Sequence, residues 1–174
     1  SEDNVMKGLS AVYNPFRRMT SGYYGGLEGI MHLQMRGDDL YPTRGEEPYI
    51  WEYLSFVNTT NTKDLSWGNI YEGIQMANEF IYRAATVDMD ETKREQMIGE
   101  AYFLRGFWYF RLRTDYRDAV IRTLPQDADP ETHGLSSGDE VLEQAISDFK
   151  EAKSRLPKLR SSDENGRVTQ GAAI

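Results

Sequence analysis

Apolar residues recur at helical spacing over three long stretches of this chain, and this pattern constrains its fold more than any other feature. In residues 66–85, one helical face carries Trp67, Tyr71, Ile74, Ala77, Asn78, Ile81 and Ala85. In residues 91–114, one stripe carries Met97, Ala101, Leu104, Trp108 and Leu112, with Phe103, Phe107 and Phe110 beside it. So wide an apolar face indicates burial on more than one side. The pattern predicts an all-α protein.

The third stretch, residues 137–156, has clear signals at both ends. Ser137 and Glu140 form an S-x-x-E capping box, in which each side chain satisfies a free backbone N–H at the start of the helix. Pro157 ends the helix. The apolar face between them consists of Leu142, Ala145, Ile146, Phe149, Ala152 and Leu156. This stretch is therefore a third amphipathic helix.

Three further segments complete the predicted organisation. A helical pattern occupies residues 3–18, where Pro15 is expected to end or bend the helix. Residues 115–136 are rich in Pro and Asp, which predicts an extended connection. Residues 166–169 read as the start of a fourth helix, one turn before the last residue.

The helix lengths suggest tetratricopeptide-like (TPR-like) hairpins with irregular loops, although no clean 34-residue repeat is visible. We expect helices 66–85 and 91–114 to form one hairpin. Helix 137–156 would then pair with a fourth helix that is cut short. Its apolar row, Leu142, Ile146 and Phe149, should consequently be exposed, and a chain ending there should self-associate.

The charge pattern argues against nucleic acid as a partner. Lys and Arg total 20 against 28 Asp and Glu, which gives a net charge of -8. No stretch gathers basic residues to follow a phosphate backbone. The nearest cluster, which we interpret as ion-paired structure, consists of Arg105, Arg111, Arg113, Arg117 and Arg122.

Patterns for catalysis, cofactors and metals are missing from the sequence. The chain has no Cys, no G-x-S-x-G and no G-x-x-x-x-G-K-[ST]. His32 and His133 have no second ligand at zinc spacing. Asp127, Asp129 and Glu131 imitate the start of a calcium loop, but the glycine and the closing glutamate are misplaced. We therefore expect no enzyme activity, no cofactor and no metal site.

Residues 99–112 read G-E-A-Y-F-L-R-G-F-W-Y-F-R-L. This string resembles the G-E-A-x-F-L-R-A-x-x-Y-F-x-L signature of the SusD/RagB family of outer-membrane nutrient-binding lipoproteins. Upstream, the family's W-x-x-x-Y-x-G-I-x-x-x-N helix is matched by Trp67, Tyr71, Gly73, Ile74 and Asn78. Residues 166–173 resemble its G-R-x-T-x-x-A-A motif. A further motif, with Phe149 in place of Leu, is matched by Val141, Ile146, Asp148, Ala152, Leu156 and Pro157.

One segment departs from the family pattern. Residues 116–121 read Y-R-D-A-V-I, whereas the family usually has F-G-D-V-P-L. Because both the glycine and the proline of that pattern are absent, we expect a different turn at this position.

The resemblance implies that residues 1-174 are the N-terminal, TPR-containing part of a longer surface lipoprotein. It implies a lipid anchor on an upstream Cys in the cell outer membrane, and ligand delivery to a TonB-dependent, SusC-like transporter. The ligand implied by the resemblance is a glycan or a peptide, and our first hypothesis is a glycan. The alternatives are a TPR-like protein-interaction scaffold, a peptide-binding RagB-like protein and, least favoured, a carbohydrate-active enzyme.

The signature residues are interpreted as packing elements rather than as a site. Glu100 and Arg105 are expected to form an internal ion pair or hydrogen-bond set inside the aromatic helix. Asn78, on the buried face of its own helix, is expected to bond a neighbouring backbone group. The same structural motif also includes Trp67, Tyr71 and Tyr109.

The candidate ligand site is an aromatic row in a loop. In an extended segment, Tyr49, Trp51 and Tyr53 all point to one side. Such a row can stack on sugar rings, while Arg44 or Glu52 bonds their hydroxyls. The alternative is an edge strand that packs on the helices. We predict the ligand-binding residues to be Arg44, Tyr49, Trp51 and Tyr53.

Overall fold

The computed structural model describes residues 2–16, 37 and 67–174. The chain divides into two units, one made of residues 1–13 and 70–174 and the other of residues 14–69. The first unit is described below. The helices of the described residues are α1 (Glu2–Tyr13), α4 (Trp67–Ala84), α5 (Glu91–Asp115) and α6 (Gly138–Arg155), with short 3-10 helices at Asn14–Phe16, Ser162–Glu164 and Gln170–Ala173.

The all-α prediction is confirmed, since residues 2–16 and 67–174 contain helices, loops and a single isolated bridge between Ala119 and Ser136. The TPR resemblance stays a prediction. None of the helices in these ranges combines the length and hydrophobicity that crossing a membrane requires.

The helix boundaries follow from capping groups in the sequence. At the start of α5, the Asp90 side chain accepts a hydrogen bond from the Lys93 backbone N–H at 2.9 Å. At the start of α6, the predicted capping box is confirmed, because the Glu140 carboxylate accepts from the Ser137 backbone N–H at 2.8 Å. Each cap satisfies a backbone donor that the helix itself cannot pair.

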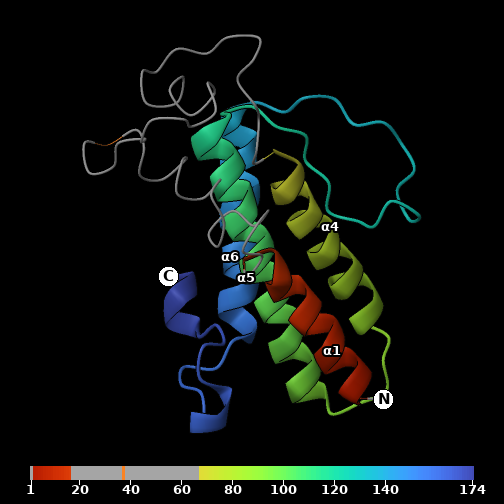
Figure 1. The fold of residues 1–174 in the computed structure, drawn as a ribbon, viewed down its shortest axis with the longest axis vertical. Helices are drawn as coiled ribbons and strands as arrows, with labels where there is room; N and C mark the ends of the chain where they lie inside the picture. The colour runs from red at the N-terminus through yellow and green to blue at the C-terminus, as the bar shows by residue number, and fades with distance from the viewer. Residues whose placement is uncertain (1, 17–36, 38–66) are drawn as a thin grey trace, which may run out of the picture. The chain divides into compact units, whose positions relative to one another are not determined.

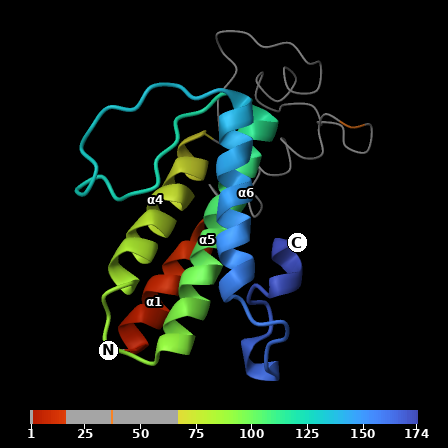
Figure 2. The same cartoon turned by 180° about the vertical axis from the view of Figure 1, so that it is seen from behind.

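Helix α5 lies between α4 and α6, as both views show (Figures 1 and 2). Glycines allow its close approach to both neighbours. A Cβ at Gly73 of α4 would lie 2.3 Å from Nε1 of Trp108, so the indole fills the space of the missing side chain. A Cβ at Gly106 of α5 would lie 3.0 Å from the Cβ of Asp148 on α6. The wide apolar face of α5 is thus covered on two sides.

The prediction that helix 137–156 lacks a partner is wrong, because α6 packs along α5 (Figure 2). Phe149 of α6 contacts Phe103 of α5, with ring centroids 5.5 Å apart. Of the apolar row predicted to be exposed, Ile146 is 43% exposed, whereas Leu142 and Phe149 are half-buried. The prediction paired helices in sequence order, whereas α5 packs against both α4 and α6. Self-association stays a prediction.

The segment after α5 contains an unusual backbone conformation. Arg117 has a φ of 69°, in the left-handed region that glycine enters easily and other residues rarely adopt. The turn therefore has a positive φ although arginine stands where the family pattern has glycine. The difference from the family's turn stays a prediction.

Candidate functional site

The predicted ligand residues Arg44, Tyr49, Trp51 and Tyr53 lie outside the described residues. The signature residues, in contrast, are described. They form two groups of buried polar contacts on α5, which we call the central cluster (Asn78, Arg105 and Asp148) and the Glu100 cluster (Tyr13, Glu100, Arg160 and Arg167). Trp67 is the first residue of α4.

The central cluster joins three helices through one guanidinium group. Arg105 Nη2 and Nε donate to the two carboxylate oxygens of Asp148 at 2.7 and 2.9 Å. Arg105 Nη1 donates to Asn78 Oδ1 at 2.8 Å and to the carbonyl of Thr123 at 3.0 Å. The side chains of Arg105 and Asp148 are only 5% and 2% exposed. Burial raises the pKa of the Asp148 carboxyl, and the hydrogen bond and charge of Arg105 oppose that shift.

The amide of Asn78 ties this cluster to the connection between α5 and α6. Its Nδ2 donates to the carbonyls of Arg122 and Leu124 at 3.0 and 3.2 Å. The prediction that Asn78 bonds neighbouring backbone groups is thereby confirmed. Asn78 is 1% exposed, so these bonds replace water that the buried amide has lost.

Two tyrosines hold the same connection. Each phenol bonds both the backbone N–H and the backbone carbonyl of one residue. The Tyr71 hydroxyl donates to the carbonyl of Val120 and accepts from its N–H, both at 2.8 Å. The Tyr109 hydroxyl donates to the carbonyl of Arg122 at 2.5 Å and accepts from its N–H at 2.8 Å. Because these partners are alternate residues, the phenols occupy positions that a neighbouring strand would otherwise fill. Burial raises the pKa of both phenols.

In the Glu100 cluster, three side chains donate four hydrogen bonds to one carboxylate. Tyr13 of α1 donates to Glu100 Oε2 at 2.6 Å. Arg160 Nη2 and Arg167 Nη2 donate to Oε1 at 2.7 and 2.5 Å, and Arg167 Nε donates to Oε2 at 3.1 Å. Glu100 is fully buried, at 0% exposure, and Glu164 lies beside both arginines. The cluster therefore fixes α1 and the segment after α6 to α5.

Of the two predicted forms, an ion pair between Glu100 and Arg105 is wrong, since each residue bonds other partners, whereas internal hydrogen-bond sets that fix helix packing are observed. Positions five apart on an α-helix point about 140° away from each other at 3.6 residues per turn. They consequently face different neighbours. The polar contacts themselves were foreseeable from charged residues in an aromatic helix, but their partners, Asp148 and Arg167 among them, lie at separations that local spacing cannot reveal.

The arginine run was predicted to be ion-paired, and Arg105, Arg111, Arg113 and Arg117 have carboxylate partners, whereas Arg122 bonds a backbone carbonyl. Its partners are Asp148 for Arg105, Asp115 for Arg111, Asp139 for Arg113, Asp118 for Arg117 and the Glu131 carbonyl for Arg122. The acidic run that imitates a calcium loop is also engaged. Asp127 pairs with Arg83 at 3.1 Å, and Asp129 bonds His133 at 2.6 Å. The described residues contain no group of three metal-ligating side chains.

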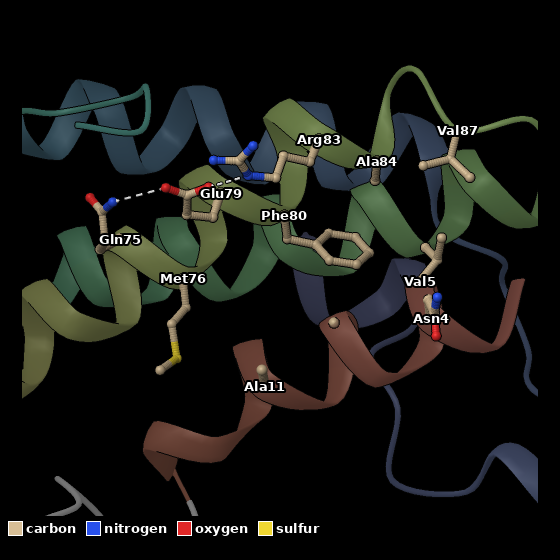
Figure 3. A pocket seen from close by; sticks show the side chains of 11 residues that line it. Asn4, Val5, Ala11, Gln75, Met76, Glu79, Phe80, Arg83, Ala84 and Val87 are labelled. Atoms are coloured by element: carbon tan, nitrogen blue, oxygen red, sulfur yellow. Dashed lines mark hydrogen bonds and ion pairs between the residues drawn. The ribbon is translucent and has the colours of Figure 1, made fainter. Parts of the chain in front are cut away.

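An apolar groove of about 450 Å³ lies between α1 and α4 (Figure 3). Val5, Phe80 and Ala84 line it, and small residues of α1 such as Gly8 leave its space open. The polar side chains at its edge bond one another: Glu79 accepts from Gln75 at 3.3 Å and from Arg83 at 2.6 Å. The sequence pattern did not predict this groove. Its mainly apolar lining suits an apolar group better than a polyol.

The fold and the clusters define a class of protein: an all-α scaffold in which α5 carries buried polar contacts to α1, α4, α6 and the segments that follow α5 and α6. Residues 37–174 match the family model of SusD-like proteins described as "Starch-binding associating with outer membrane". The chain belongs to this SusD-like family.

Sequence and structure relatives agree with this assignment. SusD-like protein P38 of Formosa agariphila is 25% identical over 167 residues, which cover 92% of this chain and 31% of the relative. A laminarin-binding SusD-like protein has a TM-score of 0.85 at 27% identity, covering 98% of this chain and 38% of that one. A SusD superfamily protein from Bacteroides vulgatus has a TM-score of 0.83 at 25% identity, covering 99% and 38%. The chain thus spans about a third of these relatives' length.

Proposed function

We propose that the protein captures a glycan at the cell surface and delivers it to a TonB-dependent transporter of the SusC-like type in the outer membrane. The observation that carries this proposal is the match of residues 37–174 to a family described as starch-binding and outer-membrane associating. A structural relative that is named for laminarin binding points to the same class of ligand. A peptide ligand has no such support. Anchoring through a lipid on an upstream Cys belongs to the same proposal.

The ligand site is proposed at Arg44, Tyr49, Trp51 and Tyr53. The contacts of the signature support this placement indirectly. The charged groups of Glu100 and Arg105 are buried and bonded to other side chains, so they have little capacity left for sugar hydroxyls. We therefore assign this site to an aromatic row, which offers stacking faces, rather than to the charged residues of the signature.

Binding of laminarin and starch to the intact protein, measured by titration calorimetry, tests this proposal. We expect saturable binding of at least one glycan, and at least tenfold weaker binding when Trp51→Ala or Tyr53→Ala removes a stacking ring. Phe110→Ala is the matched control, because this ring is 43% exposed and is not one of the proposed site residues. It should leave affinity unchanged.

Two other outcomes separate the site from the function. Unchanged affinity in both Trp51→Ala and Tyr53→Ala, with glycan binding intact, would show that the site is elsewhere. If no glycan binds while the protein is retained on an immobilised SusC-like transporter, the protein is a protein-interaction scaffold instead.

A further inference from the structure

A second hollow, of about 380 Å³, lies over the central cluster. Side chains of α4, α5 and α6 line it together with the connection between α5 and α6. The lining residues used below are Tyr82, Tyr102, Thr123, Gln144, Ser147 and Glu151. The volume falls in the range of about 300–1,000 Å³ that is typical of small-molecule sites. The hollow therefore has room for a short saccharide.

The charged groups at this hollow are neutralised in pairs. Arg105 binds Asp148 through both carboxylate oxygens, and Glu151 pairs with Arg155. An anionic ligand would have to compete with Asp148 for Arg105, and a cationic ligand would have to compete with Arg155 for Glu151. The remaining polar groups, on Thr123, Gln144 and Ser147, are uncharged. Gln144 Nε2 donates to Asp148 Oδ1 at 3.0 Å, so the group that Gln144 offers a ligand is its carbonyl oxygen, an acceptor. This chemistry suits a neutral ligand that carries several hydroxyl groups.

Exposed apolar surface borders the same hollow. Tyr82 is 50% exposed and Leu124 is 42% exposed, although both are large apolar residues. Exposed apolar residues that gather beside a hollow are typical of binding sites, and a tyrosine ring can cover the C–H face of a sugar. Tyr102 is less available, because the Arg105 guanidinium carbon lies 5.1 Å from its ring centroid.

We propose that this hollow is a second saccharide-binding site, in which Tyr82 stacks on a neutral sugar ring and Gln144 and Ser147 bond its hydroxyls. The proposal rests on the proposed function for its ligand class. It adds a site formed by side chains of the helical scaffold, none of which belongs to the aromatic row of Tyr49, Trp51 and Tyr53.

Calorimetric titration of the intact protein with laminaribiose and maltose tests this site. We expect a binding class that Tyr82→Ala weakens about tenfold and that Trp51→Ala leaves in place. Tyr82→Phe keeps the ring and should stay within about threefold of the parent. Ile146→Ala is the matched control, because Ile146 is next to Ser147 on α6, is 43% exposed and does not line the hollow. It should not change affinity.

The outcomes separate this inference from the proposed function. Loss of all binding in Trp51→Ala, with no effect of Tyr82→Ala, would overturn the second site and leave glycan capture standing. Loss in Tyr82→Ala but not in Trp51→Ala would support the second site and overturn the first assignment. Equal loss in Tyr82→Ala and Tyr82→Phe would contradict stacking. Absence of saturable binding to either sugar, together with none to laminarin or starch, would overturn both proposals.

Discussion

The central cluster and the Glu100 cluster lie on the same helix but are balanced differently. In the central cluster one guanidinium pairs with one carboxylate, and the Asn78 amide oxygen accepts a further hydrogen bond from the guanidinium. In the Glu100 cluster a single buried carboxylate serves two arginines and a phenol, with Glu164 as a partial second anion. The difference teaches that the acid and the base of one sequence signature, here Glu100 and Arg105, need not pair with each other. The signature describes two junctions, each completed by residues distant in sequence.

The balance of charge predicts that the central cluster is the less tolerant of the two. Arg105→Met leaves the Asp148 carboxylate buried without its counter-charge, which costs about 3–5 kcal/mol of unfolding free energy. Urea denaturation of the parent and the variant measures this loss. It is the largest effect expected of these changes.

A double variant serves as the control for that prediction. In Arg105→Met with Asp148→Leu, neither charge is buried, so the protein should be more stable than Arg105→Met alone. If the double variant is no more stable than the single one, the uncompensated charge of Asp148 is not the cause of the loss.

Glu100→Gln is expected to cost less, about 2–3 kcal/mol, because Glu164 still pairs with Arg160 and Arg167. The same urea titration measures it. Combining Glu100→Gln with Glu164→Gln should cost more than the sum of the two single changes. Simple additivity would contradict the role of Glu164 as a second anion.

Alkaline titration compares two phenols. Tyr13 belongs to the Glu100 cluster, and Tyr109 bonds the same Arg122 carbonyl as Asn78 of the central cluster. Burial raises the pKa of Tyr109 above its ordinary value of 10.0, and burial together with the charge of Glu100 raises that of Tyr13. Above about pH 10 the unfolded chain releases these protons before the folded one, so stability falls as pH rises. Each phenol contributes at most about 1.4 kcal/mol per pH unit.

Unfolding by urea between pH 9 and 11, alongside absorbance titration of the tyrosines, checks this dependence. Tyr109→Phe and Tyr13→Phe should each make the loss of stability with pH less steep. A parent protein equally stable at pH 9 and 11 would contradict the raised pKa values.

The smallest expected effect lies outside both clusters. Arg117→Gly should stabilise the protein by about 0.5–1 kcal/mol, because the relief of left-handed strain exceeds the added flexibility of the unfolded chain. Thermal unfolding would show a rise in Tm of a few degrees. Asp118→Gly, at a neighbouring residue without positive φ, is the contrast: it relieves no strain and removes the bond from the Gly138 N–H to Asp118, so it should lower Tm.

The fold was predictable where local signals are strong. Helical periodicity and the Ser137–Glu140 capping box located α4, α5 and α6 to within two residues of their observed bounds. Pairing was not predictable in the same way. That α6 packs along α5 depends on a close approach at Gly106, which is a property of two surfaces rather than of one stretch of sequence.

Among the polar contacts, too, some were predictable from local sequence and others depended on residues distant in sequence. The bonds from Asn78 to backbone carbonyls could be anticipated, because a buried amide must find partners. The partner of Arg105 could not be anticipated, because Asp148 lies 43 residues away in sequence. The candidate aromatic row stays a prediction, and the hollow over the central cluster became visible only once four segments were placed together.

The central claim is that Glu100 and Arg105, the charged residues of the α5 signature, hold the helical scaffold together and do not bind the ligand. The most direct test measures laminarin affinity and unfolding free energy on the intact Glu100→Gln protein. We predict a loss of about 2–3 kcal/mol in stability with unchanged affinity of the folded protein. Unchanged stability with at least tenfold weaker laminarin binding would contradict this claim and place Glu100 in the ligand site.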